Sequence, residues 1–170
     1  MILSTTDTRK GFTIVELLIV IVVIGILAAI TIVAFNGVQD RANASALESD
    51  FATLKKRLEV FKIDSPSGTY PTTIAHLDSL GIRASKSAYD STQNNLYYCY
   101  NIANNTYAIG ARTKSMKSYI MTDSTKPTVV SSVYGSQTCT AASTVWGSAN
   151  AANSVGYDSA SSLWAGWTDR

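Results

Sequence analysis

The sequence predicts an α+β protein, with one long N-terminal helix packed on a small antiparallel sheet and an irregular C-terminal segment. Three observations predict this class. An almost unbroken apolar run occupies residues 12–35, and a helical apolar stripe follows it in residues 36–63. Short segments rich in Tyr, Ile and Val, separated by turn residues, then lie within residues 64–170. That last region is long enough for one domain of about 100 residues.

The first residues are ordered unlike those of a secretory signal peptide. Arg9, Lys10 and Gly11 precede the apolar run, whereas the cut in a secretory signal follows its apolar core. A cut after Gly11 would therefore remove residues 1–11 as a leader and leave the apolar run at the start of the mature chain.

Residues 12–35 are long and apolar enough to form a transmembrane helix, since about 20 apolar residues cross a bilayer. Arg9 and Lys10 flank its start, and the next basic residue is Arg41. The positive-inside rule places residues 1–11 in the cytoplasm and the chain from residue 36 onward outside.

Glu16 is the one charged residue within this apolar run. A carboxylate inside a membrane helix costs roughly 2.5–3.5 kcal/mol on insertion scales, so it is expected to have a partner. A cut after Gly11 would create such a partner, the new α-amine on Phe12 of a neighbouring subunit. The alternative is a hydrated carboxylate near the interface that favours the N-terminal helix dipole.

The segment from Gly11 to Ile21, continued by Gly25 to Ile30, resembles the N-terminus of prepilins, the precursors of type IV pilins and of secretion pseudopilins. The resemblance implies a pilin-like fold, cleavage after Gly11 by a prepilin peptidase and N-methylation of Phe12. It also implies subunit assembly through Phe12 and Glu16. Many family members carry a helix-bending proline where this chain has Val33, so we expect no unwound segment there.

The apolar helix is expected to continue through residues 36–63 as an amphipathic extension. Five large apolar residues recur there at spacings of 4, 3, 4 and 3, which is typical of a helix face: Leu47, Phe51, Leu54, Leu58 and Phe61. A coiled coil is the alternative, but two heptads are fewer than the usual three or four. The turn-rich segment 64–68 is expected to end the helix.

The extracellular domain, residues 64–170, is predicted to be β-rich. We expect a short helix near residues 74–80 and strands at 95–102, 107–112, 117–122 and 127–134. Residues 141–170 are rich in Ala, Ser, Asn and Gly and contain three tryptophans. We expect an irregular segment that wraps the sheet with its tryptophans docked, rather than an exposed aromatic platform for a sugar.

Cys99 and Cys139 both lie in the part predicted to be outside the cell. An even pair in an exported region predicts a disulfide. Closing a loop of about 40 residues would stabilise the fold by about 4 kcal/mol in the chain-entropy model. Two unpaired buried thiols are the alternative, and two Cys with one His supply too few ligands for a typical metal site.

An enzymatic role is not expected, and neither is a cofactor. His76 is the only histidine, and the sequence has no nucleophile elbow, paired-histidine zinc helix or phosphate-binding glycine loop. A net charge of +2 gives no indication of a specific nucleic-acid surface. Asp123 and Asp158 are isolated, which argues against the calcium site of some pseudopilins. Glycosylation at Asn43 or Asn104 is not expected, despite the matching tripeptides.

The sequence thus predicts a structural subunit of a type IV pilus-like filament, serving adhesion, twitching motility or DNA uptake. Residues 12–35 would hold it in the cytoplasmic membrane before assembly and form the filament core afterwards. The resemblance implies four kinds of partner: a prepilin peptidase, copies of itself and other pilins, an assembly ATPase, and an inner-membrane platform protein. A type II secretion pseudopilin and a non-polymerising, membrane-anchored surface binding module are the alternatives.

Overall fold

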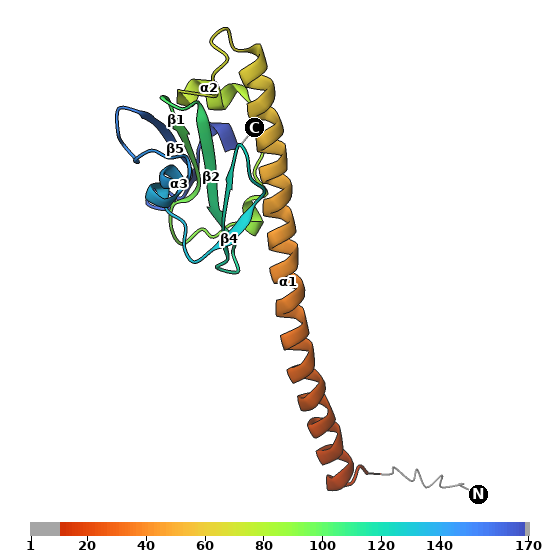
Figure 1. The fold of residues 1–170 in the computed structure, drawn as a ribbon. Helices are drawn as coiled ribbons and strands as arrows, with labels where there is room; N and C mark the ends of the chain where they lie inside the picture. Colours follow the sequence, from red (N-terminus) through yellow and green to blue (C-terminus); the bar gives the residue numbers. More distant parts are fainter. Residues whose placement is uncertain (1–10, 169–170) are drawn as a thin grey trace, which may run out of the picture. The chain divides into compact units, whose positions relative to one another are not determined.

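The computed structural model describes residues 11–168 of the chain (Figure 1). These residues fall into two compact units that divide after Val38. The first contains the apolar start of a long helix. The second, from Gln39 onward, holds the rest of that helix and all the strands. The leader residues Arg9 and Lys10 lie outside the described residues.

The long helix, α1, runs from Ile14 to Asp64 without interruption. No break occurs at Val33, in agreement with the absence of a proline there. The helix ends at the predicted turn, where Ser65 N–H donates to the Phe61 carbonyl at 2.8 Å. Gly68 then adopts a φ of +62°, a left-handed conformation that glycine accepts at little cost.

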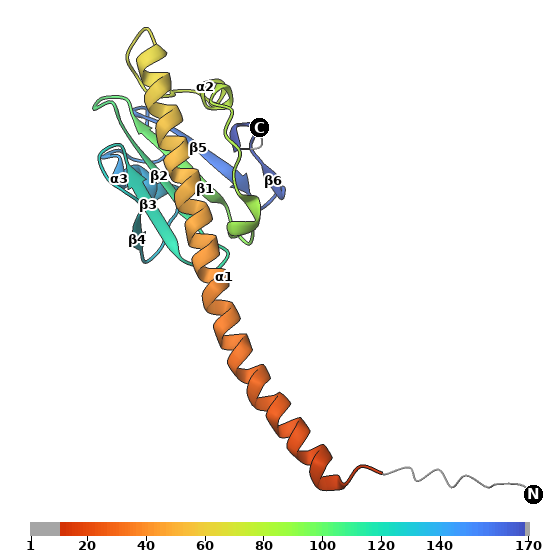
Figure 2. The same ribbon diagram turned by 90° about the vertical axis from the view of Figure 1, so that its right-hand side faces the viewer.

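Six antiparallel strands form one sheet in the order β4-β3-β2-β1-β5-β6 (Figure 2). The fold is therefore α+β with a long N-terminal helix, as predicted. The strands are β1 (Asn95–Asn101), β2 (Thr106–Arg112), β3 (Ser118–Thr122), β4 (Thr128–Val130), β5 (Ala151–Asp158) and β6 (Leu163–Trp164). The described part of the domain also contains two short α-helices, α2 (Ile74–Ser79) and α3 (Gly135–Ala141), and two 3-10 helices, η1 (Lys86–Ala88) and η2 (Gly166–Thr168).

The predicted apolar stripe of α1 lies in the core of the domain. Leu47, Phe51, Leu54 and Leu58 are each at most 2% exposed, and they cluster with aromatic and aliphatic side chains of the sheet. Alternation along β1 and β2 produces this face, because every second side chain of a strand points to the same side. The sheet side chains in the cluster include Tyr98, Tyr100, Tyr107 and Ile109.

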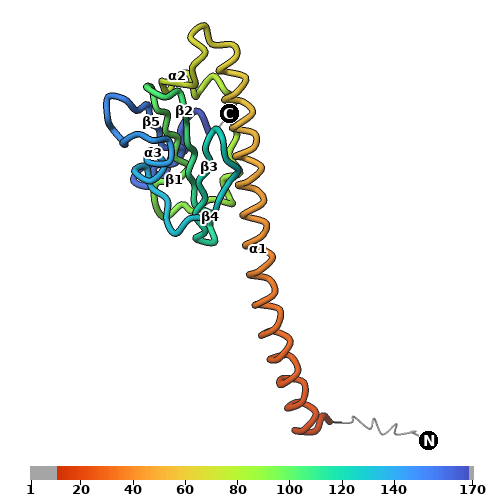
Figure 3. Tube along the Cα trace, viewed as in Figure 1, coloured from red at the N-terminus to blue at the C-terminus, as the bar shows by residue number. Residues whose placement is uncertain are grey.

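Helix α3 contacts β1, β2, β3 and β5, and Figure 3 places it on the side of the sheet away from α1. Cys99 of β1 and Cys139 of α3 form a disulfide, with their Cα atoms 5.1 Å apart. Gly110 permits the close contact, since a Cβ there would lie 2.3 Å from Thr138 Oγ1. The disulfide therefore joins the central strand to the helix that covers its far face.

Two carboxylates fix the segment before β1. Asp50 of α1 accepts hydrogen bonds from the Ser85 amide at 2.7 Å and from the Tyr89 hydroxyl at 2.9 Å. Asp90 is 3% exposed and forms an ion pair with Arg112. Burial opposes ionisation of Asp90, but hydrogen bonds from Thr92 and the Arg112 guanidinium outweigh it and lower the pKa of this carboxyl.

Two sequence-based predictions were wrong in detail. The fourth strand is shorter than residues 127–134, and the C-terminal segment is not wholly irregular, because β5 pairs with β1 along six residues. Small residues in β5 make room for the chain end: a Cβ on Gly156 would lie 2.9 Å from Thr168 Cγ2. Tertiary packing thus overrides a weak strand propensity.

The prediction that the tryptophans dock was correct. Trp167 is fully buried and donates from Nε1 to Ser154 Oγ at 3.0 Å. Trp164 packs on Tyr157 with ring centroids 5.1 Å apart, and Trp146 packs edge-on against Tyr97 at 5.9 Å. The C-terminal segment is therefore part of the folded domain.

Candidate functional site

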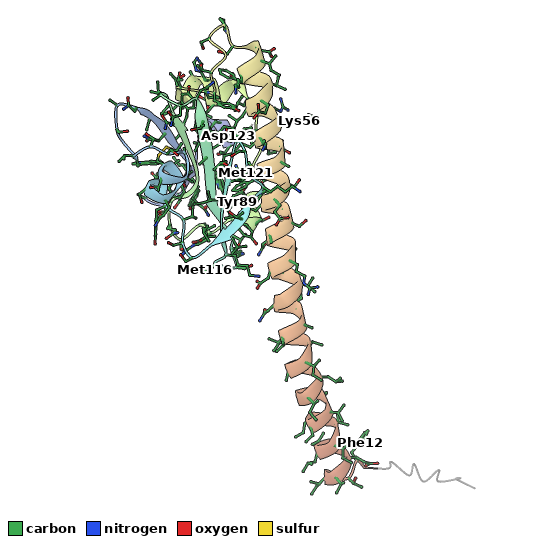
Figure 4. All side chains as sticks on the ribbon, viewed as in Figure 1. Phe12, Lys56, Tyr89, Met116, Met121 and Asp123 are labelled. Atoms are coloured by element: carbon green, nitrogen blue, oxygen red, sulfur yellow. A yellow bond between two sulfur atoms is a disulfide. The ribbon has the colours of Figure 1, made fainter. Side chains whose placement is uncertain are left out.

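Gly11 and Phe12 lie in non-helical chain immediately before α1. Phe12 is 91% exposed, and a Cβ placed on Gly11 would meet no atom within 4 Å. Figure 4 shows the Phe12 side chain at the start of the helix. Both residues are exposed and lie outside the helix, so neither is packed against the described part of the chain.

Glu16 has a hydrogen-bonding partner within its own chain. Its Oε2 atom accepts from the Thr13 backbone N–H and from the Thr13 hydroxyl, each at 2.8 Å. In return, the Glu16 N–H donates to Thr13 Oγ1 at 3.2 Å. This reciprocal arrangement is a capping box, which satisfies two N–H groups that a helix start otherwise leaves unpaired.

The sequence reasoning missed Thr13, although the Thr-x-x-Glu spacing before an apolar run is a recognised signal for a capping box. The single chain thus presents Glu16 with a local partner, while the pairing expected across subunits involves a Phe12 amine that exists only after cleavage. The two arrangements use the same carboxylate. The capping box therefore describes how an unassembled subunit can hold Glu16.

The apolar segment buries none of its side chains in the single chain. Every residue from Gly11 to Gln39 is exposed, including Leu17 at 63% and Ile24 at 59%. Exposed apolar surface of this extent marks a membrane or protein interaction site. Among the residues that the structure describes, α1 alone is long and apolar enough to span a membrane, with a mean hydropathy of 3.3 in its most apolar window.

The remaining candidate residues have local structural roles. His76 is exposed on α2, 5.2 Å from the Phe61 ring centroid, and its Nδ1 accepts from the Thr72 N–H at 3.4 Å. Asn43 lies inside α1, and Asn104 lies in the turn between β1 and β2. Within residues 11–168, no three His, Cys, Asp or Glu side chains gather as a metal-binding group.

One comparison with known proteins bears on the start of the chain. A family model described as the prokaryotic N-terminal methylation motif matches residues 7–32. This match covers Gly11 and Phe12, which flank the expected cleavage point, and Thr13 and Glu16, which form the capping box. The chain therefore carries a prokaryotic N-terminal methylation motif that includes these four residues.

The chain is similar to type II secretion system core protein G of several bacteria. It is 36% identical to that of Escherichia coli K12 over 78 residues, which are 46% of this chain and 52% of the relative. It is also 36% identical to the Klebsiella michiganensis protein over 74 residues, 44% of this chain and 51% of the relative. The Aeromonas hydrophila protein is 36% identical over 72 residues, 42% of this chain and 49% of the relative.

The chain thus spans about half the length of the curated relatives it matches. No solved structure matches it. The methylation motif lies at the start of a helix that is long and apolar enough to span a membrane.

Proposed function

We propose that this protein is a pseudopilin, a filament subunit of a type II secretion system. The observation that carries the proposal is the similarity of 78 of its residues to core protein G, a type II secretion component, combined with an apolar helical segment whose side chains are all exposed. This assignment replaces the pilus subunit as the leading interpretation, because the relatives named by the comparison belong to secretion systems.

In this proposal, residues 12–35 anchor the subunit in the cytoplasmic membrane with the domain outside. A prepilin peptidase cuts after Gly11, and the new Phe12 amine is N-methylated. During assembly, Glu16 exchanges its Thr13 donors for the Phe12 amine of a neighbouring subunit, and the apolar helix leaves lipid to pack against other helices. An assembly ATPase and an inner-membrane platform protein would drive this step.

A structural rather than catalytic role is part of the same proposal. Its support is the large exposed apolar surface of residues 12–35, which is typical of a membrane or protein interaction site, together with the exposed position of His76. The domain would present a surface to neighbouring subunits or to a secreted protein.

A subunit of a type IV pilus is the second candidate. The matched region covers less than half of this chain. The Cys99–Cys139 disulfide crosslinks the domain, and the described residues contain no cluster of carboxylates that could hold a metal ion. A disulfide suits a domain that reaches the cell surface, outside reducing compartments.

Deletion of the gene in its native host separates the two candidates. A pseudopilin deletion should abolish release of exoproteins into the medium while surface pili remain, and expression of the intact gene should restore secretion. Loss of surface filaments with unchanged secretion would contradict the secretion assignment and favour the pilus. A Glu16→Ala gene serves as the matched control, because its product keeps the domain but lacks the assembly carboxylate.

A further inference from the structure

The loop between β2 and β3, residues 113–117, combines positive charge with an exposed apolar side chain. Lys114 and Lys117 are exposed, and Met116 is 59% exposed. Met116 also has a φ of +66°, a left-handed conformation that side-chain-bearing residues adopt at a cost. The fold thus contains a strained backbone conformation at Met116, whose exposed side chain lies in a basic loop.

This loop is held in one conformation by hydrogen bonds. The Thr113 N–H donates to the Lys117 carbonyl at 2.8 Å, and the Met116 N–H donates to the Thr113 carbonyl at 2.9 Å. The Lys114 N–H donates to the Ala88 carbonyl at 2.7 Å. Because its backbone is already ordered, the loop would lose little conformational entropy on binding a partner.

The loop lies beside the first turns of the domain's part of α1. Asn43 Nδ2 donates to Ser115 Oγ at 3.0 Å, and Lys117 Nζ lies 3.9 Å from Asp40 Oδ2. Asp40 follows the end of the apolar segment, Phe35, by five residues, or about 8 Å of helix. The contact of this loop on α1 is therefore close in sequence to the end of the segment proposed to span the membrane.

The opposite end of β3 is fastened further along α1. Lys55 Nζ donates to the Asp123 carbonyl at 2.7 Å, and Figure 4 shows Met116 and Asp123 at opposite ends of this strand. Of the two ends of the strand, the one that carries Met116 contacts α1 earlier in the chain. The contact of this end on α1 is therefore the closer one in sequence to residues 12–35.

The charges at this end of the domain favour an anionic partner. Arg41 is exposed on the adjoining turn of α1, and with Lys114 and Lys117 it gives three cations against the carboxylate of Asp40. Basic residues within a Debye length of a bilayer are attracted to anionic headgroups, and apolar side chains enter the boundary between headgroups and acyl chains.

We propose that the β2–β3 loop is a lipid-contact site, in which Lys114, Lys117 and Arg41 bind anionic phospholipid headgroups and Met116 enters the membrane interface. This inference rests on the proposed membrane insertion of residues 12–35. The contact fixes the rotation of the domain above the bilayer before assembly, and it is broken when the subunit is drawn into a filament.

The test uses the full chain reconstituted into vesicles, with a fluorophore attached to Met116→Cys and spin-labelled lipids as quenchers. Vesicles of phosphatidylcholine alone are compared with vesicles that also contain phosphatidylglycerol. Ile102→Cys, exposed in the turn at the other end of β2, carries the same fluorophore as the matched control. Val22→Cys reports insertion of the apolar helix.

Strong quenching at position 116 that depends on phosphatidylglycerol, with none at 102, is the expected result. Changing Lys114 or Lys117 to Gln should weaken the contact about fivefold for each charge removed. No quenching at 116 alongside quenching at 22 would overturn the lipid-contact site and leave membrane insertion intact. No quenching at 22 would overturn both. Shielding of position 116 only in assembled filaments would replace lipid with a second copy of the chain.

Discussion

The two parts of α1 form one continuous helix, but their apolar side chains are buried in one part and exposed in the other. From residue 39 onward, the helix buries a stripe of four large apolar residues in its own domain. Before residue 39, a more apolar sequence buries none. A helix of this composition gains most of its stability from packing rather than from propensity. The described chain gives the first part no such packing, and in the proposed function lipid and then other subunits provide it.

Loss of the disulfide should have the largest effect on the domain and none on the apolar segment. Replacing Cys99 and Cys139 together with Ala removes a link across 40 residues and should lower the free energy of unfolding by about 4 kcal/mol. The free energy of unfolding is measured by denaturation monitored through tryptophan fluorescence. Reduction of the disulfide in the wild-type chain should lower it by a similar amount. An unchanged transition midpoint would show that α3 holds to β1 without the bond.

A pair of matched leucine substitutions separates the two parts of α1. Leu54 is 2% exposed in the domain core, so Leu54→Ala should cost about 2–5 kcal/mol through lost burial and a cavity. Leu27 is 57% exposed, so Leu27→Ala should leave domain unfolding unchanged. Both are measured by urea denaturation in detergent. Equal destabilisation by the two changes would contradict the conclusion that only the part of α1 from residue 39 onward packs in the domain core.

Acid should weaken the domain through Asp90. The pKa of this carboxyl is lowered in the folded state, so its stabilisation is present above the unfolded value of about 3.9 and is lost as the pH falls through the folded pKa. Asp90→Asn should cost about 1.5–3 kcal/mol at neutral pH, the range for a hydrogen bond to a charged group. It should also flatten the decline of stability below pH 4, measured by denaturation across pH. A slope equal to that of the wild type would exclude Asp90 as its source.

The smallest effect is expected at the capping box. Thr13→Val keeps the side-chain shape but removes the hydroxyl, which should destabilise the first turn of α1 by about 1 kcal/mol. Hydrogen exchange in micelles should show faster exchange of the Glu16 amide, whereas Thr13→Ser should retain protection. Equal exchange in all three proteins would mean that the capping hydrogen bonds do not persist in a membrane-like medium.

The sequence predicted α1, the strand positions of β1 to β3 and the fold class because each depends on local periodicity. Leu47 to Phe61 repeat with the helical period, and Asn95 to Thr122 contain three strands separated by turn residues. It did not predict β5, whose Ala, Asn, Ser and Gly residues carry no strand signal of their own. That strand forms because β1 offers a free edge and because Trp167 closes over the small side chains.

Within the candidate site, the sequence alone singled out Gly11, Phe12 and Glu16. A small residue, a bulky apolar residue and a carboxylate occur there in this order at the start of an apolar run. Thr13 carries a signal in the same segment, the Thr-x-x-Glu spacing, which the sequence-based interpretation did not include. The β2–β3 loop could not have been found from sequence, since its position beside Asp40 and Asn43 depends on tertiary contacts.

The N-terminus of the mature protein tests the central claim most directly, namely that the exposed apolar helix is retained for assembly. N-terminal sequencing and intact mass should be measured on protein from native membranes and filaments. The account predicts a chain that begins at Phe12 and is one methyl group heavier than the unmodified sequence. A chain that begins at Met1, or one cut beyond Phe35 so that the apolar segment is lost, would contradict it.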